Sequence, residues 1–362
     1  MMQDILFSSN DVEKFYSLLK NHKQNQKDIY VNPSTELTMN DNGRLVIDNR
    51  TEMVPTNYFE QMLAQKLGIP YDYYIKMPEY LRAINVNHWL KQDNTTKLIR
   101  ALQTPDSIYA RAYLSDRYMI IDNYDVMTAV LMALKTLNKP VVFHRAFVSE
   151  KMMNVNILDN SKRYNIGKDR DDYVSFGINI QNSEVGYSAF TMNMFIYRYV
   201  CSNGMVTGVN NIRRVHIGSK YTGPTDWVSD NTRRLESKLL LSTITDMVNY
   251  IFNDDNKQII VEKMIDAREQ RIEQSTGILN AMKKVMGLTE EEASSAWSIL
   301  REPSRFEITQ AITQMAQKYE TSVDENTRIN GEKRLRLEEK AGKLMFDDEV
   351  WNKFIKTSSG SD

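Results

Sequence analysis

Hydrophobic and polar residues alternate through the middle of the chain with the period of two that is typical of β-strands. Between 172 and 181, apolar residues occupy every second position: Val174, Phe176, Ile178 and Ile180. A polar turn at 182–184 separates this run from a second one at 187–201. Alternation on both sides of a polar turn predicts a long β-hairpin. Neither face of the second run is cleanly polar, so we expect a central strand covered on both sides, with Arg198 as the odd charge.

Helical and turn patterns surround this hairpin. Apolar residues at helical spacing predict helices at 10–20, 56–67, 71–89 and 123–134. In the third of these, Tyr73, Tyr74, Met77 and Tyr80 are expected to pack inward. The pair Asn42-Gly43 predicts a tight hairpin between 37–39 and 45–47. Further strands are expected at 98–102, 108–114, 119–121, 141–148, 152–158 and 205–209, with an edge strand at 212–217. After Pro224 only helical patterns follow, including a capping box from Thr289 to Glu292.

These patterns divide the chain into four parts. We expect a mixed helix and hairpin segment, a β-rich core with one helix, a helical region and a disordered tail, at 1–95, 96–224, 225–356 and 357–362. Strands and helices are segregated along the sequence, which favours an α+β fold. The predicted fold is an antiparallel sheet with a long central β-hairpin, followed by an all-helical C-terminal region.

Composition narrows the classes of function. The chain has 46 Lys and Arg against 47 Asp and Glu, a net charge of −1, so contact with nucleic acid requires a local basic patch. The single cysteine, Cys201, excludes an intramolecular disulfide and a thiolate metal site, and we expect it to pack rather than react. No apolar run approaches the length of a membrane span, and the first residues lack a signal-peptide pattern. We therefore expect a cytoplasmic protein without membrane contact.

The sequence contains no motif that predicts a reaction, a metal or a cofactor. Phosphate loops, dinucleotide fingerprints and nucleophile elbows are absent. The four histidines lie far apart in the sequence and lack ligand spacing: His22, His88, His144 and His216. Asp169, Asp171 and Asp172 could gather around a divalent cation. Because Lys168 and Arg170 interleave with them, a solvated loop accounts for them better.

Basic and aromatic residues gather between 187 and 240. Seven basic residues stand against three acidic ones in this stretch. Cations along a backbone and rings that stack on unpaired bases are what single-stranded DNA binding requires. The residues expected to make these contacts are Arg198, Arg213, Arg214, Lys220, Arg233, Arg234, Tyr199, Tyr221 and Trp227. The alternative, in which the tyrosines fill the core and the arginines solvate an edge strand, stays open.

A second basic group, Arg100, Arg111 and Arg117, lies on the strands predicted at 98–102 and 108–114 and in the turn just beyond them. Arg111, Arg117 and Tyr118 could grip a phosphate through guanidinium forks. A structural salt bridge from Arg111 to Asp116 or Asp122 is an equally good interpretation.

Four segments carry a resemblance to a known family. They are KLGIPY (66–71) with Tyr74 and Met77, NVN (85–87) with Trp89, RAYLSDRY (111–118) with Asp122 and Asn123, and RYVCSNG (198–204). These segments resemble the phage/plasmid-like protein family, a group of uncharacterised proteins carried by phages, prophages and plasmids, over about 53–218. The positions that match its motifs are Arg111, Ser115, Asp116, Tyr118, Arg198, Cys201 and Asn203. The resemblance implies a role in replication, recombination or defence evasion. The order of strands, hairpin and helix is also similar to the core of phage single-strand annealing proteins.

The preferred hypothesis is a phage- or plasmid-encoded protein that binds or anneals single-stranded DNA across the hairpin without nucleotide hydrolysis, as a homo-oligomeric ring or filament. The alternative is a protein-binding module that inhibits or recruits a host or phage protein through the acidic helical region. A metal-dependent nuclease that uses Asp116, Asp122 and the carboxylates at 169–172 ranks lowest, because these residues lie in predicted turns.

Overall fold

The computed structural model describes residues 5–167, 171–200, 203–207, 212–214, 230–273, 277–319 and 330–360. Within 203, 212–214, 230–237, 241 and 330 it describes the backbone only.

The predicted hairpin is the centre of the larger of two sheets. In the described residues this sheet has eight strands: β1 (Ile5–Ser8), β8 (Val141–Val148), β9 (Met153–Asp159), β10 (Tyr164–Asn165), β11 (Tyr173–Asn182), β12 (Phe190–Arg198), β13 (Asn203–Val206) and β14 (Ile212–Arg214). Their order is β1-β8-β9-β11-β12-β13, with β10 on β11 and β14 on β12, and all the pairs are antiparallel. The second hairpin strand is shorter than the run expected at 187–201, because 183–189 form the connection.

The smaller sheet has six strands: β2 (Gln26–Val31), β3 (Leu37–Met39), β4 (Leu45–Ile47), β5 (Thr51–Pro55), β6 (Lys97–Gln103) and β7 (Ile108–Ser115). Gly43 has a φ of 71° in the turn between β3 and β4, which confirms the predicted hairpin. The β5–β7 pair is parallel, unlike the antiparallel pairing expected. Strands β6 and β7 belong to the same sheet as β2 and β5. This sheet therefore contains residues from both sides of the boundary that was predicted between the first two parts of the chain, at residue 95.

The helices occupy the expected regions, except for the short helix α2, which was not predicted. Those before the hairpin are the 3₁₀ turn Ser9–Asp11, α1 (Val12–Asn25), α2 (Pro33–Glu36), α3 (Asn57–Lys66), α4 (Tyr71–Tyr74), α5 (Glu79–Leu90) and α6 (Asn123–Leu137). Those after it are α7 (Asp230–Ile251), α8 (Asp254–Glu269), α9 (Ile278–Lys284), α10 (Glu290–Ile299), α11 (Arg305–Gln317), α12 (Asn330–Phe346) and α13 (Asp348–Ser358). The capping box of Thr289 and Glu292 is confirmed. The tail expected to be disordered from Thr357 begins inside α13.

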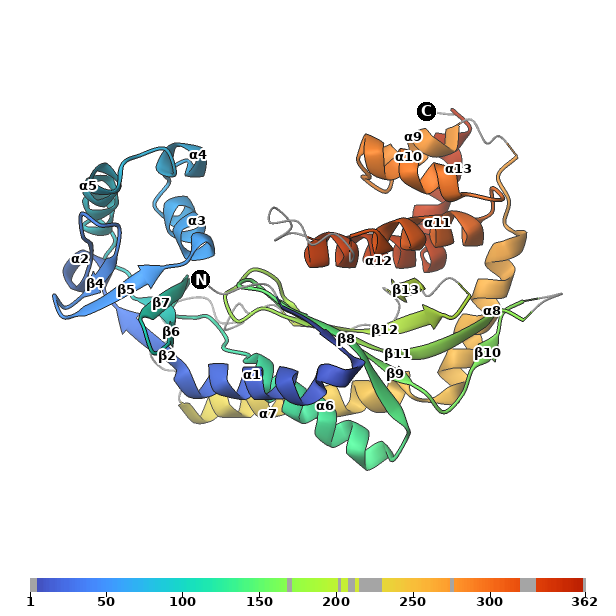
Figure 1. Cartoon of the computed structure of the whole chain (residues 1–362), viewed down its shortest axis with the longest axis horizontal. Coiled ribbons are helices and arrows are strands. Elements are labelled where there is room, and N and C mark those ends of the chain that lie inside the picture. The colour runs from blue at the N-terminus through green and yellow to red at the C-terminus, as the bar shows by residue number, and fades with distance from the viewer. Residues whose placement is uncertain are drawn as a thin grey trace.

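The helical lobe lies over the larger sheet, and the small lobe lies beyond one end of it (Figure 1). The small lobe contains the six-stranded sheet with α2 to α5, and the helical lobe contains α9 to α13. Helices α1, α6 and α7 lie below the larger sheet, while α11 and α12 lie above it. We call the face toward α12 the upper face. The main apolar core joins the lower face of the larger sheet to the helices below it and continues through α8 into the helical lobe. A smaller apolar cluster on the upper face joins Phe147, Met152, Leu158, Phe195, Val206 and Leu335.

Candidate functional site

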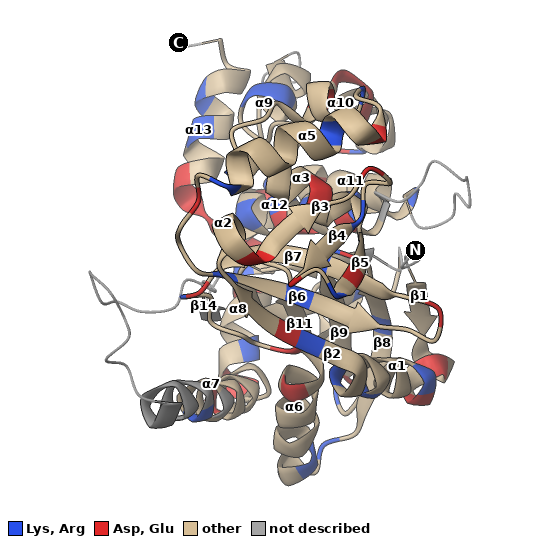
Figure 2. Ribbon diagram, turned by 90° about the vertical axis from the view of Figure 1, so that its left-hand side faces the viewer, with Lys and Arg blue, Asp and Glu red and all other residues tan. Residues whose placement is uncertain are grey.

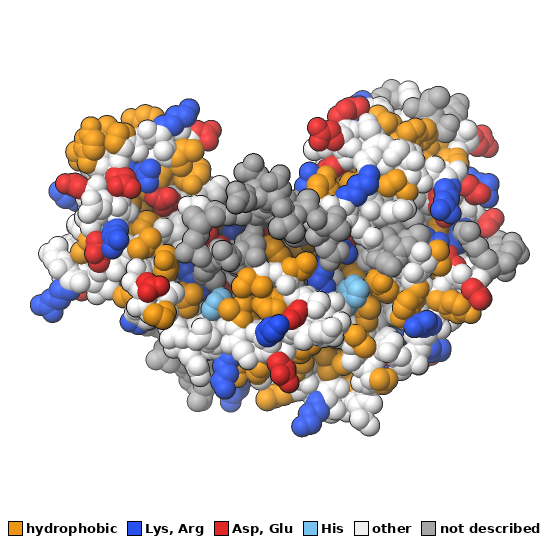
Figure 3. All heavy atoms as spheres, viewed as in Figure 1, with side chains coloured by type: hydrophobic (Ala, Val, Ile, Leu, Met, Phe, Trp, Pro, Cys, Tyr) orange, Lys and Arg blue, Asp and Glu red, His pale blue; other side chains and the backbone are white. Residues whose placement is uncertain are grey.

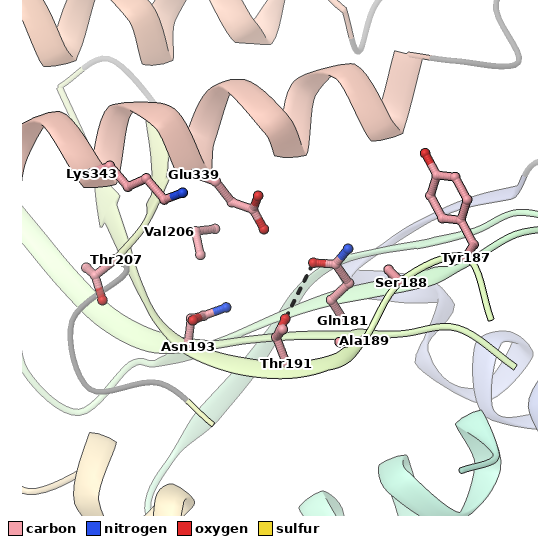
Figure 4. A pocket seen from close by; sticks show the side chains of 10 residues that line it. All are labelled: Gln181, Tyr187, Ser188, Ala189, Thr191, Asn193, Val206, Thr207, Glu339 and Lys343. Atoms are coloured by element: carbon pink, nitrogen blue, oxygen red, sulfur yellow. Dashed lines mark hydrogen bonds between the residues drawn. The ribbon is translucent and has the colours of Figure 1, made fainter. Parts of the chain in front are cut away.

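A polar cavity of about 480 Å³ lies between the upper face and α12 (Figure 4). Its walls come from the hairpin, from β13 with the residue after it, and from one side of α12. The lining residues are Gln181, Tyr187, Ser188, Ala189, Thr191, Asn193, Val206, Thr207, Glu339 and Lys343.

Strand alternation places polar side chains under α12. On β12, Met192 and Met194 pack into the main core, while Thr191 and Asn193 face the cavity. The register aligns Asn193 with Asn179 of β11, and Asn179 in turn with Asn156 of β9. Asn179 donates from Nδ2 to Oδ1 of Asn156 at 2.6 Å. A row of amide side chains therefore crosses a sheet face where apolar residues would be expected.

Several of these buried groups have no hydrogen bond within the described residues. Asn193 is only 5% exposed, and its amide has no partner there. The hydroxyls of Ser188 and Thr207 are also buried and unpaired in the described part of the chain. A buried polar group without a partner costs about 1–3 kcal/mol, so this cavity is suited to a ligand that supplies the missing bonds.

One carboxylate and one ammonium group face the cavity from α12. Glu339 and Lys343 are one helical turn apart, and both side chains extend toward the sheet in Figure 4. Neither makes a hydrogen bond or an ion pair with another described residue. Burial raises the pKa of Glu339, Lys343 opposes this shift, and the neighbouring carboxylate Glu338 adds to it. Glu339 therefore takes up a proton more readily than an exposed glutamate does.

An aromatic group with one cation lies beside the cavity, which only its member Tyr187 lines. Tyr187 is 42% exposed and lies 5.7 Å from Tyr58, ring centroid to ring centroid. The ammonium of Lys151 lies 5.2 Å from the Tyr187 ring. This arrangement offers an exposed ring for stacking beside a positive charge.

Arg198, one of the predicted DNA contacts, is buried and paired inside the protein. Its Nε and Nη2 atoms donate to the two carboxylate oxygens of Asp172 at 2.8 and 2.7 Å. Arg268 also pairs with Asp172, and Phe306 lies under both guanidinium groups. Arg198 therefore cannot hold a phosphate in this structure, and we leave it out of the DNA contact.

The other predicted DNA contacts are only partly described. Tyr199 is half-buried, hydrogen-bonded to Ser175 at 2.9 Å and stacked against Arg163. The backbone of β14 pairs Arg213 with the cavity residue Thr191 and Arg214 with Phe190. The side chains of Arg213, Arg214, Arg233, Arg234 and Asn203, and all of Cys201, Lys220, Tyr221 and Trp227, lie outside the described residues. That these residues converge on one strip stays a prediction.

The second predicted phosphate group is divided by the fold. Arg111 donates from Nη1 to Oε2 of Glu184 at 2.9 Å, and both side chains are buried. Arg111 therefore forms a structural salt bridge, as one interpretation of the sequence predicted. Its partner is Glu184 of the hairpin connection rather than Asp116 or Asp122. Arg117 is exposed in the turn after β7.

Two other residues of this segment also have internal partners. Tyr118 donates its hydroxyl to the carbonyl oxygen of Ser183 at 3.0 Å. Ser115 donates to Asp116 at 3.1 Å and accepts from the backbone N–H of Arg117. These contacts give the motif segment a structural role at the hairpin connection.

Arg100, which the sequence grouped with Arg111 and Arg117 as basic residues, links the two sheets. It is fully buried and donates to Asp28 at 2.8 Å, to Asp122 at 2.6 Å and to the carbonyl oxygen of Glu184 at 2.9 Å. Burial would raise the pKa of Glu184, but Arg111 and Arg100 outweigh it and lower this pKa to about 2. The sequence signal for the burial of Arg100 was its position as a charged residue inside an otherwise apolar strand.

The acidic residues considered for a nuclease are separated by the fold. Asp122 binds Arg100 and Lys23, Asp172 binds Arg198, and Asp116 lies in the turn after β7. Asp169 lies outside the described residues. Within the part of the chain that is described, no three His, Cys, Asp or Glu side chains are grouped to hold a metal ion.

Fold and site together define a two-lobed α+β protein with a polar cavity between a sheet and a helix. The chain belongs to the family described as "Domain of unknown function (DUF932)", whose model matches residues 112–340, more than half of the chain. The matched segment runs from β7 into α12 and contains the cavity residues from Gln181 to Glu339, but not Lys343. Comparisons with curated proteins and with solved structures gave no match.

The resemblance noted from the sequence was also to an uncharacterised family, and in this respect the two findings agree. The segment matched here extends further into the helical region than the resemblance did. No helix among the described residues has the length and apolar character that crossing a bilayer requires.

Proposed function

We propose that this protein binds single-stranded DNA, with the strand lying along the upper face beside α12. The observation that carries the proposal is the row of buried amide and hydroxyl groups at the cavity, next to the strand that holds Arg213. Polar groups without internal partners suit a ligand rich in hydrogen-bonding atoms, and a nucleic acid strand is such a ligand.

The local charge supports this assignment more than the overall charge does. In Figure 2, basic and acidic residues are interspersed over the ribbon, so no single broad basic face is visible from this side. At the cavity, Lys343 is exposed on α12, and Lys151 lies beside the exposed ring of Tyr187. These two cations, with Arg213 and Arg214, replace Arg198 and Arg111 as the phosphate contacts that we propose.

The biological role follows from the resemblance rather than from the cavity. The segments at 111–118 and 198–204 resemble proteins of phages and plasmids, so we assign this protein to such an element and to its replication or recombination in the bacterial cytoplasm. Annealing of complementary strands is downhill and requires no nucleotide hydrolysis. A homo-oligomeric ring or filament would extend the binding strip from one subunit to the next.

Binding of a labelled oligonucleotide at increasing salt tests the proposal. We expect the logarithm of the binding constant to fall linearly with the logarithm of salt concentration, by about 0.7 for each phosphate contact on a single strand. Lys343→Ala and Arg213→Ala should each reduce this slope by about 0.7, the value expected for the loss of one phosphate contact. Lys353→Ala removes the same charge from an exposed position on α13 and should leave the slope unchanged. Affinity that is absent at low salt, or that does not change with salt, rejects the proposal.

One observation favours the second candidate, a protein-binding module. Tyr73, Tyr80 and Ile84 on α4 and α5 are 57%, 53% and 62% exposed, although the tyrosines were expected to pack inward. Figure 3 shows hydrophobic side chains gathered on the small lobe, where these helices lie. A large exposed apolar surface is typical of a docking site. This surface is not on the acidic helical region, where the sequence suggested docking.

Pull-down from nuclease-treated host lysate tests this candidate. A partner that wild-type protein retains and Ile84→Asp loses would support protein binding through this surface. Equal recovery with both proteins would exclude this surface as the docking site.

A further inference from the structure

We propose that the cavity under α12 is a base-binding pocket, which takes one unpaired nucleobase out of the bound strand. This inference rests on the proposed single-stranded DNA binding and adds a specific contact to it. It predicts that the protein recognises bases as well as the phosphate backbone.

The size of the cavity fits this ligand. Pockets for small molecules commonly measure about 300–1,000 Å³, and this one measures about 480 Å³. Strands and a helix supply much of its wall, since Gln181 lies on β11, Thr191 and Asn193 on β12 and Glu339 on α12, while the connection between β11 and β12 closes one side.

The polar groups match the edge of a base. A base edge presents hydrogen-bond donors beside acceptors, and an amide side chain presents one of each. The amide of Asn193 has no partner among the described residues. Gln181 accepts from the Thr191 hydroxyl at 3.4 Å, which leaves its NH₂ group available as a donor. Asn193 and Gln181 therefore offer donors and acceptors to an inserted ring.

Two unpaired hydroxyls add adaptable contacts. Thr207 is fully buried, and its Oγ1 has no hydrogen bond in the described structure, as is also true of Ser188 Oγ. A hydroxyl can donate or accept, so the same pair can serve different bases. The methyl groups of Ala189 and Val206, which also line the cavity, can contact the flat faces of the ring.

The charged groups orient the nucleotide. Lys343 is exposed, so its ammonium can reach a phosphate outside the cavity while the base lies inside. Glu339 lies one turn earlier on α12, where its carboxylate can accept from an exocyclic amine or, when protonated, donate to a ring nitrogen. Base and backbone would thus be held by different ends of the same site.

Comparison of an intact oligonucleotide with an abasic strand of the same length tests the inference. Both carry the same phosphates, so the difference in affinity isolates the contribution of the bases. We expect wild-type protein to bind the intact strand roughly tenfold more tightly or better, which is the range measured for contacts to single bases. Asn193→Ala and the near-isosteric Thr207→Val should each remove most of that difference and keep the salt dependence.

Asn154→Ala is the matched control. Asn154 lies on β9, is 3% exposed and has an unpaired Nδ2 atom, but it does not line the cavity. This variant should keep the wild-type preference for the intact strand. Thermal unfolding of each variant establishes that it is folded at the temperature of the assay.

The outcomes separate this inference from the function on which it rests. Salt-dependent binding that is equal for both strands overturns the base pocket and leaves DNA binding in place. A preference that persists in both Asn193→Ala and Thr207→Val also overturns it, because the bases are then bound elsewhere. Absence of binding to either strand at low salt overturns DNA binding, and the base pocket with it.

Discussion

Arg111 and Arg117 are six positions apart and have the same side chain, but the structure gives them opposite surroundings. Arg111 is buried against Glu184, whereas Arg117 is exposed in a turn. A buried charge pair is costly to break, since removal of one partner leaves the other charged and desolvated. The sequence grouped the two residues as one phosphate site because their types and spacing suit that role.

The two arginines should differ sharply when they are replaced. We expect Arg111→Ala to lower the free energy of unfolding by about 3–5 kcal/mol, because it leaves Glu184 buried without its partner. Arg117→Ala should change it by less than about 0.5 kcal/mol. Urea denaturation measures both. Similar values for the two variants would contradict the buried pair.

His144 should make stability depend on pH. Burial and repulsion from Arg145 and Arg334 lower the pKa of His144 to about 4, from 6.5 in an unperturbed histidine. As the pH falls, His144 therefore takes up a proton in the unfolded chain before it does so in the folded protein. The contribution of neutral His144 to the free energy of unfolding is complete above pH 6.5 and declines toward pH 4. We expect a loss of about 2 kcal/mol between pH 7 and pH 5 from this residue.

Urea denaturation at both pH values checks this expectation. His144→Phe should reduce the difference between the two pH values, and His88→Phe, at an exposed position on α5, should preserve it. An undiminished difference in His144→Phe would assign the pH dependence to other groups.

At the scale of the elements, the roof of the cavity depends on a close approach between α12 and β13. A Cβ atom at Gly342 would overlap the carbonyl oxygen of Val206. Glycine within a helix usually costs about 1 kcal/mol relative to alanine, so a packing reason is needed for it here. The approach places Glu339 and Lys343 directly over the sheet.

Gly342→Ala tests this packing. Helix propensity alone would stabilise the variant by about 1 kcal/mol, but we expect the overlap to dominate and to lower the free energy of unfolding by about 1–3 kcal/mol. Asn352→Ala, at an exposed position on α13, raises helix propensity without creating a steric overlap. It should therefore leave the free energy of unfolding unchanged or increase it. A stabilised Gly342→Ala would show that α12 can move away from β13 at little cost.

Elements with strong local signals were predicted well. The hairpin of β11 and β12, the Asn42-Gly43 turn and the Thr289 capping box all depend on residues close together in the chain. The sequence placed β6 and β7 in the same core as the long hairpin, whereas they belong to the smaller sheet. Strand partners that are far apart in the sequence leave no local pattern from which the pairing could be predicted. The exposure of Tyr73 and Tyr80 was missed for a similar reason, since a tyrosine can pack or dock.

At the scale of the whole molecule, Arg100 connects the two sheets. It lies on β6 of the smaller sheet and binds the carbonyl oxygen of Glu184 in the connection between β11 and β12 of the larger one. It also binds Asp122, just before α6. Loss of this side chain should therefore loosen the contact between the small lobe and the larger sheet more than it loosens either sheet itself.

Hydrogen exchange with mass spectrometry measures this effect. In Arg100→Met we expect faster exchange at 119–123 and 183–187, with little change in β3 and β4. Arg82→Met is the matched control, because Arg82 pairs with Glu60 inside the small lobe and should affect exchange only there. Uniform acceleration throughout Arg100→Met would indicate general destabilisation instead of a loosened joint.

Local sequence patterns were enough to predict the α+β class, the hairpin and the segregation of helices toward the C-terminus, because alternation, capping and turn residues act over a few neighbouring positions. The tertiary structure alone decided which arginines are buried with carboxylates and which polar side chains meet under α12. Arg198 finds Asp172, and Asn193 faces Glu339 across a cavity, only after segments more than twenty residues apart pack together. Burial and partnership are properties of that packing, and they determine whether a charge is structural or available to a ligand.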